Sequence, residues 1–84
     1  MKKKLTKIYS YSVLYEAAPE GGFAAFVPAL PGCHTQGDTL EDAERNIAEA
    51  IGLYLESMAA HKNSIPQETK SFYGTVRIQV PALA

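Results

Sequence analysis

The sequence predicts an α+β domain in which three β-strands, one helix and a fourth strand follow one another along the chain. Side chains alternate between two faces over 7–15 and 72–80, which is typical of strands, and 23–27 (FAAFV) is expected to form another. Apolar residues recur at helical spacing over 39–60. With 84 residues and 46% hydrophobic composition, the chain is long and apolar enough for one folded domain, which we place at 1–84.

The first two strands are expected to pair as a hairpin. In the first, over 7–15, Tyr9, Tyr11 and Tyr15 fall on one side, which suits a half-buried sheet face. The connecting residues 16–22 (EAAPEGG) hold a proline and two glycines, the usual composition of a hairpin loop.

Residues 27–37 are punctuated by prolines and glycines with separate backbone roles. Pro28 and Pro31 fix φ and lack an N–H donor, so the second strand must end or lie at an edge there. Gly32 and Gly37 permit positive φ where a side chain would clash. A short third strand fits between them, over 33–36.

The helix over 39–60 is the clearest element. Thr39 is the expected N-cap and Asp42, three residues later, its capping-box partner. Gly52 lies in the helix interior at a cost of about 1 kcal/mol relative to alanine, so we expect a neighbouring strand or helix to approach it closely. The apolar stripe comprises Leu40, Ala43, Ile47, Ala50, Ile51, Tyr54, Leu55 and Met58.

The last strand, over 72–80, ends at Pro81. A right-handed crossover through the helix would lay it parallel to the first strand and complete a four-stranded mixed sheet with the helix on one face. One helix cannot cover both faces, and a domain of this size has a marginal core. Since the single Cys33 rules out an internal disulfide, we expect a homo-oligomer, either a dimer or a tetramer.

Four segments together resemble the HicB family of antitoxins: Gly21-Gly22-Phe23, Val27-Pro28, Leu30-Pro31-Gly32-Cys33 and 36–43 (QGDTLEDA). The resemblance implies a partial ribonuclease H-like fold. It also implies the antitoxin role in a type II toxin–antitoxin system, in which the protein neutralises a HicA-like, mRNA-cleaving toxin by direct binding, with no catalysis and no cofactor. We interpret the motif positions as structural: Gly22, Pro28, Leu30, Pro31, Gly32, Cys33, Gly37, Asp38 and Thr39.

Many HicB-like proteins carry a DNA-binding module after this domain. Here the chain ends at Ala84, so we expect no separate DNA-binding domain. The basic start, with four lysines in its first seven residues, could touch nucleic acid, although such a terminus is more often a solvated tail. No run approaches the ~20 apolar residues of a membrane span, and a cytoplasmic protein is the default expectation.

Charge suggests where a partner would bind. From 38 to 56 the chain carries six acids against one base, Arg45. A toxin that binds RNA should present a basic surface, which an acidic helix would complement. The candidate partner surface is Glu41, Glu44 and Glu49 together with Tyr9 and Tyr11. The open sheet face is expected to carry either the tyrosines or the alternate side chains of that strand.

The same residues bear on other possible functions. A nuclease of the ribonuclease H type needs converging carboxylates, and the first strand contains none. Cys33 and His34 could form a thiolate–imidazole pair, but neighbours in an extended segment point to opposite faces. Tyrosines can stack on RNA bases, although no basic residues interleave them here. A binding or scaffolding module of the same family without a toxin stays open.

Overall fold

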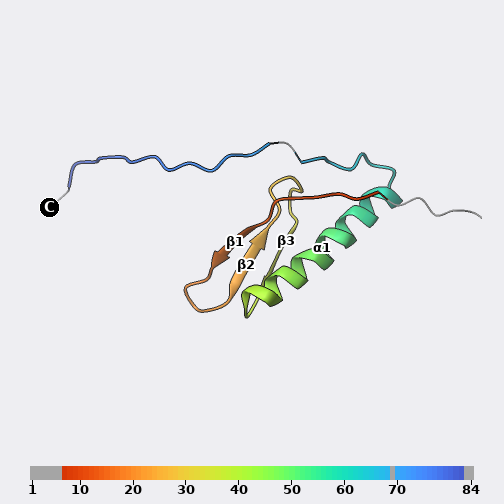
Figure 1. Cartoon of the computed structure of the whole chain (residues 1–84), viewed down its shortest axis with the longest axis horizontal. Coiled ribbons are helices and arrows are strands. Elements are labelled where there is room, and N and C mark those ends of the chain that lie inside the picture. Colours follow the sequence, from red (N-terminus) through yellow and green to blue (C-terminus); the bar gives the residue numbers. More distant parts are fainter. Residues whose placement is uncertain (1–6, 69, 83–84) are drawn as a thin grey trace, which may run out of the picture.

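The computed structural model describes residues 7–68 and 70–82. In these ranges the strands β1 (Leu14–Ala17), β2 (Phe23–Phe26) and β3 (His34–Gly37) precede the helix α1 (Leu40–Ala60). The strands form one antiparallel sheet in the order β1-β2-β3, and α1 packs along it (Figure 1). The α+β class and the order of the first four elements are therefore confirmed.

A five-residue connection, 18–22, joins β1 to β2. Gly21 N–H donates to Ala18 O at 3.0 Å, and Ala18 N–H donates to Gly22 O at 2.9 Å. Gly21 takes a φ of 106°, which a residue with a side chain rarely adopts. A turn followed by a glycine bulge matches the twist of two antiparallel strands, so the glycines fix the hairpin.

Two consecutive β-turns connect β2 to β3. Leu30 N–H donates to Val27 O at 3.0 Å, and Cys33 N–H donates to Leu30 O at 2.9 Å. Each turn has a proline at its second position, and Gly32, with φ 82°, supplies the third position that a type II turn requires. The prolines end β2 as predicted, and the shared residue Leu30 is driven into the core.

The start of α1 confirms the predicted cap. Thr39 Oγ1 accepts a hydrogen bond from Asp42 N–H at 3.0 Å. The role expected of Gly37 is corrected, because the glycines with positive φ in the described residues are Gly21, Gly22 and Gly32. A Cβ on Gly37 would lie 2.4 Å from Ala43 N, so this glycine lets the helix N-terminus pack directly on β3.

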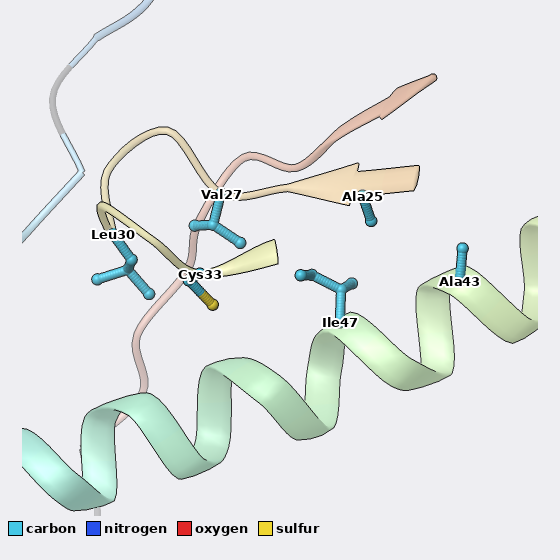
Figure 2. Close-up of a cluster of buried hydrophobic side chains, with 6 residues drawn as sticks. All are labelled: Ala25, Val27, Leu30, Cys33, Ala43 and Ile47. Atoms are coloured by element: carbon cyan, nitrogen blue, oxygen red, sulfur yellow. The ribbon is translucent and has the colours of Figure 1, made fainter. Parts of the chain in front are cut away.

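A small core lies between the sheet and α1 (Figure 2). Leu30 and Ile47 are its largest fully buried side chains, and the double turn and the helix supply one each. Half-buried side chains surround it, among them Val13, Phe23 and Leu55. The fully buried members are Ala25, Val27, Leu30, Cys33, Ala43 and Ile47.

β1 begins at Leu14 rather than at the predicted residue 7, because the hydrogen bonds between β1 and β2 cannot continue to Pro28. The register pairs Leu14 with Phe26, so Ser12 would stand opposite Pro28, which has no N–H to donate. Ser12 N–H donates instead to Glu68 Oε1 at 2.6 Å, and Ser12 Oγ donates to Glu68 Oε2 at 2.7 Å.

The predicted fourth strand is not part of the sheet, which has three strands, so the four-stranded mixed sheet is not confirmed. Residues 70–82 are exposed, extended and unpaired, and they run away from the sheet and helix (Figure 1). The chain returns from α1 and contacts the segment before β1 through Glu68 and through Tyr11, whose hydroxyl donates to Pro66 O at 2.5 Å. These contacts hold residues 66–68 beside residues 11–12, which precede β1. They therefore lie before the β1 edge, where a parallel fourth strand would have to pair.

The Glu68 contact predicts a titration that NMR can follow. Hydrogen bonds donated by the Ser12 hydroxyl and N–H lower the pKa of the Glu68 carboxyl. The contact is therefore present above the unfolded-state pKa and is lost as the pH falls through the depressed folded-state pKa. We expect the Ser12 amide shift to titrate below the usual glutamate range. In Glu68→Gln that titration of the Ser12 amide shift should vanish. If the Ser12 amide shift of the native chain titrated at an ordinary glutamate pKa, the contact would be contradicted.

Candidate protein-binding surface

The outer side of α1 is negatively charged. Glu41, Glu44 and Glu49 are all exposed, as the sequence predicted for a partner surface. Arg45 is bound by Asp42 in an i,i+3 ion pair on the helix surface. The helix therefore presents glutamates to solvent while its one arginine is engaged by a neighbouring acid.

An exposed leucine lies one helical turn from one of these glutamates, Glu49. Leu53 is 62% exposed and lies at i+4 from Glu49 and i−3 from Glu56, positions that share a helix face. Gly52, next to it, has open space where a Cβ would be, so the expected close approach of an element of the same domain is not found in the described residues. Sequence analysis passed over Leu53, although its place outside the apolar stripe was the signal.

Gly52 therefore permits a test of α1 as a free surface. We expect Gly52→Ala to raise the free energy of unfolding by about 1 kcal/mol, because alanine loses less backbone entropy in a helix and meets no neighbour. Urea unfolding followed by circular dichroism measures this. A destabilised variant would show that another part of the molecule covers Gly52.

The tyrosines lie apart from the acidic surface. Tyr11 and Tyr15 pack against the core on the helix side, not on the open face. Tyr9 stacks on Tyr11 with ring centroids 6.5 Å apart. Partial burial, then Tyr9 and Glu68, raise the pKa of the Tyr11 hydroxyl, which is held by Pro66 O. Tyr11 thus fits core packing. The residues predicted to bind a partner therefore lie in two separate places, the glutamates on α1 and the tyrosines before β1.

The open face of the sheet instead carries the alternate side chains. Leu14, Phe26 and His34 form one cross-strand row, with the Phe26 and His34 rings 6.0 Å apart between centroids. Phe26 is 37% exposed, and the polar residues Glu16 and Gln36 follow in the next row. This face is a narrow apolar strip with polar flanks.

Cys33 and His34 point to opposite sides, as predicted. Cys33 is 6% exposed within the core, and burial raises the pKa of its thiol, which disfavours the reactive thiolate. His34 is exposed on the open face. Within 7–68 and 70–82, no three side chains of the histidine, cysteine or acidic type are placed to hold a metal ion.

The remaining motif residues shape an open pocket of about 510 Å³ between the hairpin loop and the start of α1. A Cβ on Gly22 would lie 2.8 Å from Gly37 O, so Gly22 must lack a side chain for the loop to pack on the backbone of β3. Asp38 lines the pocket, and Asn46 Nδ2, at its rim, donates to Gln36 O at 2.9 Å. Pro31 acts elsewhere, since its carbonyl oxygen accepts from the Tyr54 hydroxyl at 3.0 Å and ties the double turn to α1.

These features define a small α+β domain whose exposed acidic helix suits protein binding. Residues 11–77 match the family described as HicB_like antitoxin of bacterial toxin-antitoxin system, and the chain belongs to that family. Family membership supports an antitoxin role. It also implies, in general, a toxin partner.

Relatives in bacteria and archaea share most of the chain. A UPF0150 protein of Synechocystis sp. is 53% identical over 62 residues, covering 74% of this chain and 78% of the relative. UPF0150 proteins of Thermoplasma acidophilum and Helicobacter pylori are 45% and 42% identical, covering 69% and 70% of this chain and 84% and 82% of their own lengths. In the described residues, α1 is not apolar enough to cross a membrane.

Proposed function

We propose that this protein is the antitoxin of a type II toxin–antitoxin pair and that it neutralises a HicA-like, mRNA-cleaving toxin in the cytoplasm by covering it. The observation that carries the proposal is the outer side of α1, where Glu41, Glu44 and Glu49 are exposed and Leu53 lies one turn beyond Glu49. The β-β-β-α order is compatible with the first part of a partial ribonuclease H-like fold, which belongs to the same proposal.

Electrostatics explains how such a surface would act. A toxin that cleaves mRNA binds a phosphate backbone and needs a basic surface. Glu41, Glu44 and Glu49 would attract that surface, speed encounter and compete with RNA for it. Leu53, one turn from both Glu49 and Glu56, would add an apolar contact at one end of this charged surface.

Charge reversal tests this surface. We expect Glu41→Lys/Glu44→Lys/Glu49→Lys to weaken toxin binding by about tenfold or more, mainly through slower association, because the attraction becomes repulsion. Surface plasmon resonance at several salt concentrations measures it. The control is Glu16→Lys, which reverses an exposed charge on the open face of the sheet and should bind normally. Equal affinities for the two variants would exclude the helix as the toxin-binding surface.

Co-expression separates an antitoxin from a toxin-free module of the same family. The neighbouring gene is expected to encode a small basic protein with a single catalytic histidine. Expression of that protein alone should arrest growth, and co-expression of this chain should restore it. A neighbour that is harmless, or a toxic one that this chain fails to rescue, would favour the binding module without a toxin.

A further inference from the structure

The segment after α1 exposes an apolar strand pattern to solvent. Phe72 is 88% exposed, Val76 81% and Ile78 76%, and they alternate with the polar side chains of Thr75 and Arg77. The match to the family continues through residue 77, so this pattern belongs to the family's domain and is not an appended tail. Such side chains are found in solvent when the surface that covers them is missing.

The dimensions of the single chain also indicate that residues 70–82 lack the surface that would cover them. Its radius of gyration is 17.6 Å, whereas a compact domain of 84 residues has about 12 Å. The longest extent is 74 Å against 28 and 19 Å for the others, and Figure 1 shows the segment 70–82 reaching away from the body. A lone extended strand of this kind is not stable in water, because nothing pairs its backbone.

The sheet offers one unoccupied edge. Since Ala18 N–H bonds to Gly22 O, the hydrogen-bonded pairs recur at Glu16 and Leu14 toward β2. The backbone groups of Tyr15 and Ala17 therefore point outward from β1, where residues 7–68 and 70–82 supply no hydrogen-bond partner.

The opposite edge is covered. Val27 N–H bonds to Cys33 O, so the alternation turns the backbone of Gln36 outward from β3. Asn46 Nδ2 donates to that outward Gln36 O at 2.9 Å, and α1 packs along β3. A new strand thus finds unpaired backbone at β1 and a helix at β3.

We propose that residues 72–80 of one chain add to the β1 edge of a second copy, which returns its own segment in a two-fold, strand-exchanged dimer. Each chain contributes one donor segment and one acceptor edge, as an isologous pair requires. The contacts of Pro66 and Glu68 with Tyr11 and Ser12 fix the point at which the segment leaves its own body. The apolar side of the segment would then continue the helix-facing layer that Tyr15 begins.

The experiment uses the full-length chain. Native mass spectrometry should give twice the 9.1 kDa of one chain. In Val76→Asp/Ile78→Asp the mass should fall to one chain while the helical circular dichroism signal is kept, since neither side chain is buried in its own body. Gln79→Asp, on the polar side of the segment, is the matched control and should stay dimeric. Val76→Pro removes one amide donor and should also give the monomer.

Two further readouts locate the contact. In a sample mixed from labelled and unlabelled chains, isotope-filtered nuclear Overhauser effects should join residues 72–80 to β1 of differently labelled chains. The amides of Tyr15 and Ala17 should be protected from hydrogen exchange in the native chain and exposed in Val76→Asp/Ile78→Asp. A monomeric native chain, a variant that remains dimeric, or effects confined to one chain would each overturn strand exchange, the last in favour of closure onto the chain's own sheet.

Discussion

Gly37→Ala is expected to lower the free energy of unfolding by about 3 kcal/mol. The added Cβ would lie 2.4 Å from Ala43 N and 2.7 Å from Asp42 C, closer than real Cβ atoms approach backbone. Neither atom belongs to a flexible side chain, so relief requires the first turn of α1 to move off β3. That movement would also open the contact between Ala43 and the buried residues of the sheet.

Urea unfolding followed by circular dichroism measures this effect. The matched control is Gly52→Ala, the same substitution at a glycine with open space around it, for which the opposite sign is expected. If Gly37→Ala unfolded at the same urea concentration as the native chain, the close packing of α1 on β3 would be refuted. Toxin binding by the folded fraction should be retained, because Gly37 lies outside the acidic helix surface.

Leu30→Ala should cost about 2–5 kcal/mol, the range for a fully buried leucine whose removal leaves a cavity. Leu30 is 0% exposed and is held at the joint of two turns, whose backbone hydrogen bonds limit collapse of the site. A domain of 84 residues has a total stability of roughly 4–13 kcal/mol, so this single change can unfold much of the population.

Leu53→Ala is the matched control, because Leu53 is the same residue type at 62% exposure. Its stability should change by about 0.5 kcal/mol or less. A similar loss in both variants would show that α1 packs against a surface through its outer side. If Leu53→Ala weakens toxin binding at unchanged stability, the leucine is a contact of the partner surface.

The local elements could be predicted from sequence because their signals are covalent or short-range. Thr39 caps α1 through the N–H three residues on, and Pro28 ends β2 because it has no N–H. The alternation of Cys33 and His34 correctly placed one thiol inside and one imidazole outside. Each of these outcomes depends on residues within a few positions of one another.

Long-range placement was harder to predict. Alternation indicates that 72–80 can form a strand, but not which sheet edge receives it. The strand period does not say which face of the sheet meets the helix, so the sequence left open whether the tyrosines or their alternates face outward, and the open face belongs to Leu14 and Phe26. Pairing of Ser12 with Glu68 depends on a missing donor at Pro28, visible only once the register is known.

The bond from Asn46 to Gln36 has a consequence for how copies can assemble. Together with the packing of α1 along β3, this bond covers the β3 edge of the sheet. Each molecule is then bivalent, because it has one donor strand and one acceptor edge. Bivalent units can form closed pairs, rings or linear polymers, but not branched networks. At high protein concentration, any excess assembly of this chain should therefore be unbranched.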